Sequence, residues 1–140
     1  MKKSLDSLLD SVEPDATFHD ASLLELRIDF GQRLAELSFD LCVGDPKSPD
    51  VAVRERRRRG RLKLVGLHFW VVEPPGTGLA EVNSMFPWLT ADGPLSEATS
   101  SLSRELSAKT PTSATGWYLF FSNWNAFAYF AADNITFSWG

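Results

Sequence analysis

The clearest hydrophobic pattern lies between residues 24 and 43, where apolar and polar side chains alternate with a period of two on either side of Gly31-Gln32. This period is typical of half-buried strands. A two-residue loop that begins with glycine predicts a type II′ hairpin turn. The resulting register has apolar pairs on one face and an opposite-charge pair on the other: Leu24 with Phe39, Leu26 with Leu37, Ile28 with Ala35, and Arg27 with Glu36.

Weaker patterns predict the other elements. Leu5, Leu8, Leu9 and Val12 lie on one face of a helix over residues 5–12, which Pro14 ends. Residues 61–73 form a strand that becomes apolar on both faces after Gly66, where a bulge is expected, so this strand is central or covered. A second helix is expected at 94–108 and the segment 79–92 is ambiguous. Three short strands complete the set at 117–121, 126–132 and 135–139, with turns at 122–125 and 133–134.

These elements predict one α+β domain, mostly β, over residues 1–140. We expect an antiparallel sheet of about six strands, strongly curved or folded as a sandwich. The N-terminal helix, and the second helix if it forms, would cover one face or edge.

Composition adds limits on class and location. Hydrophobic residues make up 44% of the chain and charged residues 23%, which is a globular composition. No apolar run reaches the roughly 18 residues of a membrane span. Asp6, Asp10 and Glu13 interrupt any signal peptide after Lys2 and Lys3, so a cytoplasmic protein without membrane association is expected. The single cysteine, Cys42, excludes an internal disulfide and is expected to be a packing residue.

Charge is unevenly distributed along the chain. Residues 54–63 hold seven of the 14 basic side chains and one of the 18 acidic ones, so the other seven basic and 17 acidic side chains leave the remainder at −10. The run Arg56 to Arg59 can contact phosphates, but the acidic remainder opposes a polyanion and no nucleic-acid motif accompanies it. We therefore expect residues 54–60 to project into solvent and nucleic acid not to be the partner.

Candidate chemistry is sparse. His19 and Asp20 can bind a metal or move protons, although this pair lies before a strand and lacks further histidine and aspartate ligands. The favoured interpretation is that both residues bond to the backbone and fix the start of the sheet. His68 is expected to be a packed histidine in an apolar strand, and neither a nucleophile elbow nor a phosphate loop is present. No catalytic residue, metal or cofactor is predicted.

The motif Phe18-His19-Asp20-Ala21 before a hairpin resembles a loose group of small bacterial proteins, mostly uncharacterised, some of which look like predicted immunity proteins of polymorphic toxins. This resemblance implies a compact β-rich domain that works by binding a protein partner such as a toxin. His19, Asp20 and Trp124 are the candidate binding residues. Two further expectations stay open: a homodimer through the aromatic strands between Trp117 and Trp139, and the alternative of a small metal-binding protein or enzyme that uses His19 and Asp20.

Overall fold

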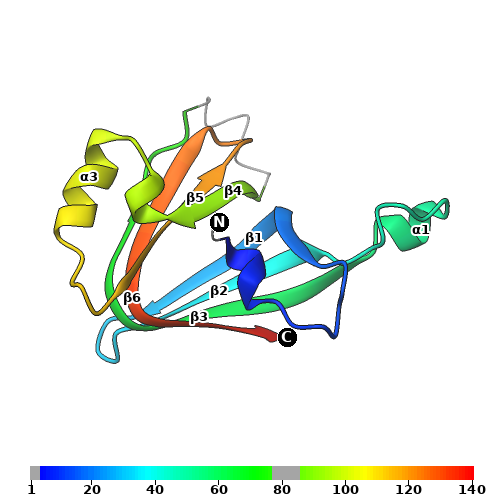
Figure 1. The fold of residues 1–140 in the computed structure, drawn as a ribbon, viewed down its shortest axis with the longest axis horizontal. Coiled ribbons are helices and arrows are strands. Elements are labelled where there is room, and N and C mark those ends of the chain that lie inside the picture. The colour runs from blue at the N-terminus through cyan, green and yellow to red at the C-terminus, as the bar shows by residue number, and fades with distance from the viewer. Residues whose placement is uncertain (1–3, 77–85) are drawn as a thin grey trace.

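A computed structural model shows a closed barrel of six antiparallel strands in the spatial order β1-β2-β3-β6-β5-β4 (Figure 1). The structure describes residues 4–76 and 86–140. The predicted mostly β, strongly curved antiparallel sheet of about six strands is confirmed, and this sheet closes on itself. The elements are η1 Leu5–Leu8, β1 Thr17–Asp29, β2 Leu34–Cys42, α1 Val51–Arg54, β3 Arg57–Val72, β4 Trp88–Pro94, η2 Leu95–Glu97, α3 Ser101–Ala108, β5 Thr115–Phe121 and β6 Ala126–Trp139.

The β1–β2 hairpin has the predicted register through most of its length. Leu26 pairs with Leu37, and the other two pairs nearest the turn also stand as predicted. The pair of Leu24 with Phe39 is wrong, because a bulge between Leu23 and Glu25 places Leu23 opposite Phe39. The type II′ turn is wrong too. The loop spans four residues, and its left-handed residue is Arg33 (φ 53°) instead of Gly31.

Strand β6 runs unbroken through residues 133–134, where the sequence predicted a turn. Figure 1 shows β6 bending sharply, and β3 bends beside it. The bend coincides with a register shift between Leu67 and Phe69 of β3, just after Gly66, which has a φ of +68°. The predicted bulge is therefore present, and it curves the long β3–β6 pair without breaking it.

Both predicted helices are shorter than their hydrophobic patterns. At the N-terminus only η1 forms, because Leu9 is already extended and the Asp6 side chain is used to bind the backbone N–H of Phe18 at 2.7 Å. Pro94 ends β4 instead of beginning a helix. The second helix, α3, begins after Ser100, whose side chain accepts the N–H of Ser103 at 2.9 Å.

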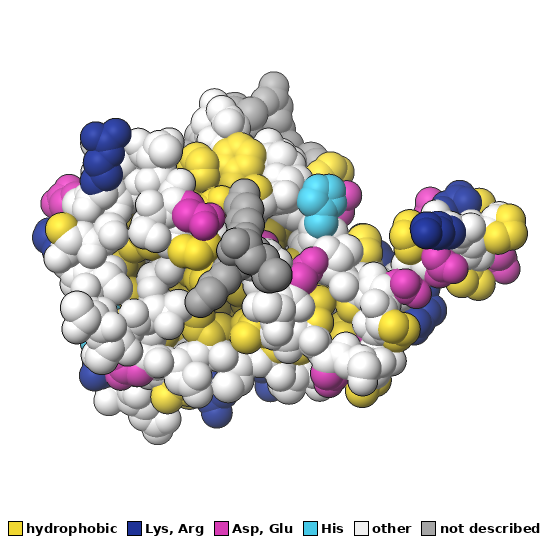
Figure 2. Space-filling model, in the orientation of Figure 1, with side chains coloured by type: hydrophobic (Ala, Val, Ile, Leu, Met, Phe, Trp, Pro, Cys, Tyr) yellow, Lys and Arg dark blue, Asp and Glu magenta, His cyan; other side chains and the backbone are white. Residues whose placement is uncertain are grey.

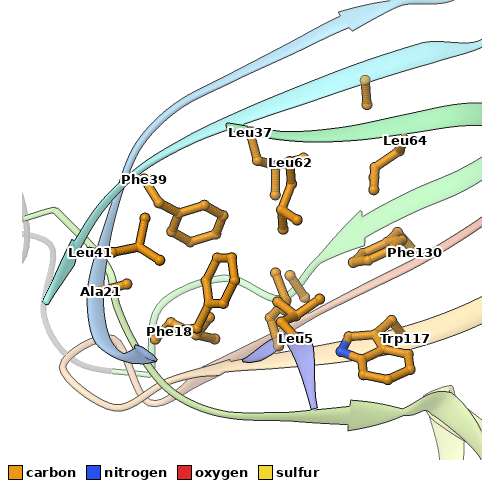
Figure 3. Packing of buried hydrophobic residues seen from close by; sticks show 14 of the residues in the cluster. Leu5, Phe18, Ala21, Leu37, Phe39, Leu41, Leu62, Leu64, Trp117 and Phe130 are labelled. Atoms are coloured by element: carbon orange, nitrogen blue, oxygen red, sulfur yellow. The ribbon is translucent and has the colours of Figure 1, made fainter. Parts of the chain in front are cut away.

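The barrel interior holds the main core (Figure 3). Inward-facing side chains of β2 and β3 meet Phe18 of β1, Phe130 of β6 and Trp117 of β5, while Leu5 of η1 lies between them from the N-terminal side. The Phe18 ring packs edge-on against Phe39 at 5.4 Å between centroids. The N-terminal segment, including η1, therefore contributes to the barrel core through Leu5 and Phe18.

A second core lies outside the barrel, beneath η2 and α3. Leu95 and Leu106 cover Tyr118 of β5 and Tyr129 of β6, and Phe69 and Val71 of β3 join them at the edge. Figure 1 shows α3 beside this part of the barrel wall. The prediction that the 61–73 strand is central or covered is confirmed, since β3 pairs with β2 on one side and with β6 on the other.

The β2–β3 connection stands away from the barrel as a lobe over residues 44–56, which carries α1 (Figure 1). Its base is closed by a hydrogen bond from Val43 N–H to the Arg56 carbonyl at 2.9 Å. Figure 2 shows hydrophobic and charged side chains of both signs on this lobe, and Val51 and Val53 are exposed there. In the described part of the chain, no helix has the length and apolar character needed to cross a membrane.

Candidate functional site

The Phe-His-Asp-Ala motif divides between the interior and the surface. Phe18 and Ala21 are fully buried, whereas the side chains of His19 and Asp20 are 65% and 59% exposed. Asp20 has a left-handed backbone (φ 64°) at the irregularity of β1 between Thr17 and Ser22, just before Ala21 and Ser22 pair with β4. The motif therefore places two core residues on either side of a bend that closes the barrel.

His19 and Asp20 contact each other, with 3.2 Å between Nδ1 and Oδ2, and their side chains do not bond to backbone as predicted. The backbone is held instead by Arg57, whose guanidinium donates to the carbonyls of Asp20 (3.1 Å) and Asp40 (2.7 Å) across the gap between the strands. Among residues 4–76 and 86–140, no group of three or more His, Cys, Asp or Glu side chains could hold a metal ion. The two side chains form an exposed pair without a third ligand.

Trp124 lies in the β5–β6 turn and packs inward against the main core, with its ring 6.5 Å from that of Phe121. Its indole N–H is buried and has no hydrogen-bond partner in the described structure. The carbonyl of Trp124 accepts the N–H of Gly76 at 2.7 Å. The structure does not bring Trp124 together with His19 and Asp20 into one site.

The arginine run does not project into solvent as a whole. Arg57 begins β3, so the side chains alternate, and Arg58 turns inward to the barrel end. There Glu13, whose side chain is only 8% exposed, accepts hydrogen bonds from Arg56 at 2.6 Å and from Arg58 at 3.0 Å. Hydrogen bonds from Arg56 and then from Arg58 lower the pKa of the Glu13 carboxyl below 4.5.

The remaining charges of the run lie on the outer surface of β3. The Arg57 guanidinium pairs with the Asp40 carboxylate of β2 at 3.0 Å. The Arg61 guanidinium lies 3.9 Å from the carboxylate of Glu36, which also belongs to β2. Together with the Glu13 contacts, these pairs show that the run lies against acidic side chains of the same molecule. The expectation that residues 54–60 all project into solvent is wrong, because strand alternation directs Arg58 and Gly60 inward.

A second histidine cluster, missed from the sequence, lies at the bend of β3 and β6. His68 Nε2 is 2.7 Å from Asp133 Oδ1, and Arg33 Nη2 is 3.1 Å from His68 Nδ1. The Arg33 guanidinium donates at Nδ1, so the proton of a neutral His68 sits on Nε2 and faces Asp133. Both ring nitrogens are occupied, and the cluster links the β1–β2 turn to the bend.

An aromatic groove lies on the outer barrel wall. It encloses about 380 Å³. Its walls are two directly opposed cross-strand pairs of β5 and β6, Tyr118 with Tyr129 and Phe120 with Phe127. The segment from Glu97 to Ser100 forms the rim beside α3. A concave, largely aromatic site with a few polar groups is typical of binding sites.

The rings of the groove have a defined order. Phe127 stacks nearly parallel on Tyr129 (6° between planes, 5.8 Å between centroids) and lies 4.8 Å from Phe120. Tyr129 is fully buried and its hydroxyl is 3.0 Å from that of Ser100, while Phe120 and Phe127 are half-buried. The alternation of Tyr118 and Phe120 against buried Leu119 is the sequence signal that marks an apolar outer face.

Comparisons with known proteins assign the chain to no family. No family model and no curated protein matches the chain. The chain is similar to the crystal structure of an uncharacterized protein from Neisseria gonorrhoeae at 13% sequence identity, with a TM-score of 0.46, over 88% of this chain and 94% of that one.

Proposed function

We propose that this protein works by binding a partner protein without catalysing a reaction, and that the aromatic groove is the docking site. The carrying observation is the convergence of Tyr118, Phe120, Phe127 and Tyr129 in one concave site outside the main core. Aromatic side chains in partly enclosed sites are the usual energetic anchors of protein interfaces.

The groove is the part of the outer barrel wall that η2 and α3 leave open. Leu95 and Leu106 already cover one side of Tyr118 and Tyr129, so the helix completes the second core there. Phe120 and Phe127 lie beyond that cover and remain half-buried. Docking of a partner would remove this apolar surface from water, which is favourable by about 25 cal/mol per Å².

Toxin immunity is the specific form of this proposal. Its support is the resemblance carried by Phe18 to Ala21 and the net charge of −10 outside residues 54–63, which suits a basic partner such as a nuclease toxin. The alternative function, a metal-binding protein or enzyme based on His19 and Asp20, has no third ligand to support it in the described structure.

The test pairs the chain with the product of a toxin gene next to its own. We expect binding by biolayer interferometry and protection of cells that express the toxin, both weakened at least tenfold by Phe127→Ser, the loss of an interface anchor. Phe30→Ser is the matched control, because Phe30 is 83% exposed at the β1–β2 turn. Absence of a neighbouring toxin gene contradicts immunity, and equal binding by the Phe127 variant and wild type contradicts docking at the groove.

A further inference from the structure

The described residues that line the groove carry negative charge and no positive charge. Glu97 is the charged side chain among the described residues that line it, and its carboxylate has no hydrogen bond or ion pair in the described structure. Gly93 allows this placement, since a Cβ there would lie 3.2 Å from Glu97 Oε2 and 3.1 Å from the Tyr118 hydroxyl. The carboxylate therefore lies close to an aromatic wall.

A second carboxylate, that of Glu73, binds the backbone of β6 at the groove residue Phe127. Glu73 Oε1 accepts the backbone N–H of Phe127 at 2.8 Å. Burial raises the pKa of the Tyr129 hydroxyl, the hydrogen bond with Ser100 lowers it, and the charge of Glu73 raises it further. Glu73 thus adds negative charge near Tyr129 and the backbone of Phe127.

Aromatic faces and carboxylates together favour a cation. A ring face attracts an ammonium or guanidinium group that lies within about 6 Å of its centroid. The chain already contains one such contact, since the Arg58 guanidinium carbon lies 5.0 Å from the Trp139 ring centroid. An apolar occupant would instead desolvate Glu97 without compensation, and an anion would be repelled.

Among residues 4–76 and 86–140, no basic side chain lines the groove. Arg104 of α3 donates to the Thr99 carbonyl at 3.3 Å, but its side chain lines a separate hollow on the far side of residues 95–98. The groove therefore presents its carboxylate to whatever approaches from solvent.

We infer that the groove receives the side chain of a lysine or arginine that projects from the partner protein, with Phe120 and Phe127 beside the cation and Glu97 as its counter-ion. This inference rests on the proposed function, since the partner is the protein that docks at the groove. The acidic character of the chain outside residues 54–63 also favours a basic surface around the inserted side chain.

The experiment titrates the protein with N-acetyl-lysine methylamide, N-acetyl-arginine methylamide and their uncharged analogue N-acetyl-norleucine methylamide, and follows aromatic and amide NMR signals. We expect saturable shifts confined to groove residues, with the cationic probes binding about fivefold more tightly than norleucine. Glu97→Gln should weaken the cationic probes about fivefold and leave norleucine unchanged. Phe127→Ser should abolish the shifts, and Phe30→Ser should change nothing.

Three results would overturn the inference: equal binding of norleucine and lysine probes, equal binding by the Glu97→Gln variant, or no groove shifts with any probe. Tighter binding of tetramethylammonium than of the lysine probe would also overturn it, because the site would then suit a free small cation. The partner-binding assay distinguishes a failure of this inference from a failure of the proposed function. Partner binding that is lost in Phe127→Ser but unchanged in Glu97→Gln would leave docking intact and refute the cation, whereas partner binding unchanged in both variants would refute both.

Discussion

Gly66→Ala is the substitution for which the structure makes the sharpest prediction, because two independent costs meet at one residue. Gly66 has a φ of +68°, a conformation that costs an L-residue about 1–2 kcal/mol. A Cβ there would lie 2.1 Å from Asp133 Oδ2 and 2.8 Å from Asp133 Cβ, so rotation of the carboxylate alone cannot relieve the contact. Such overpacking costs about 1–3 kcal/mol. The total expected loss is about 2–5 kcal/mol.

Equilibrium urea unfolding of purified variants measures this loss. Gly31→Ala is the matched control: its nearest atom to a new Cβ is Asp29 Oδ1 at 3.4 Å and its backbone is not left-handed, so it should be neutral or raise stability by about 0.4–1 kcal/mol. Gly66→Ala combined with Asp133→Gly removes the steric contact and should recover part of the loss. A Gly66→Ala variant within about 0.5 kcal/mol of wild type would refute the left-handed bulge and the close passage of Asp133.

Three further predictions concern charge. Because the pKa of Glu13 is lowered in the folded state, its carboxylate contributes stability that is fully present above pH 4.5 and is lost as pH falls through the folded pKa. Glu13→Gln should therefore lower the free energy of unfolding at pH 7 and make its decline toward pH 3 shallower. Urea unfolding at each pH measures both effects. Short duplex DNA and RNA should show no salt-sensitive micromolar binding in fluorescence titrations at low salt, and binding that is lost in Arg59→Ser/Arg61→Ser would contradict this. Elemental analysis should find no stoichiometric metal, and a metal that disappears in folded His19→Ala would restore the metal-binding alternative.

The β1–β2 hairpin was predictable because its period of two and its register depend on neighbouring residues. Leu26 and Leu37 face each other in the structure as in the sequence pattern. The errors come from local backbone geometry. Neither the bulge before Glu25 nor the left-handed Arg33 leaves a trace in the alternation, because each changes the path of the chain without changing which residues are apolar.

Strand β4 and the closure of the barrel were not predictable from the pattern. β4 contains Asp92, Gly93 and Pro94, which are typical of turns. Its pairing with β1 consists of Ala21 with Leu89 and Ser22 with Trp88, which is too short a contact to produce an alternation. The first part of the ambiguous segment, residues 79–85, lies outside the described residues.

The groove could be predicted only in part, for a related reason. Alternation places Tyr118 with Phe120, and Phe127 with Tyr129, on one face of a β5–β6 hairpin, so the aromatic wall is visible in the sequence once the turn at 122–125 is accepted. Glu97 belongs to a different segment, and only the short η2 and the strand β4 before it bring its carboxylate to that wall. The hydrophobic pattern therefore could not predict that Glu97 lies at the groove.

The arginine run shows how strand alternation changes an argument based on charge. Counted along the sequence, the run suggests a concentrated positive patch. In the fold, Arg56 and Arg58 converge on Glu13, and Arg57 pairs with Asp40, so three of its charges are partly neutralised by residues of the same barrel. Those pairs also use two of the carboxylates that make the rest of the chain acidic. The long-range field that a partner meets is thus weaker in both signs than the sequence implies. Under the proposed function, recognition would then depend more on short-range contacts, and the groove offers them, with a carboxylate that has no partner among the described residues beside stacked aromatic rings.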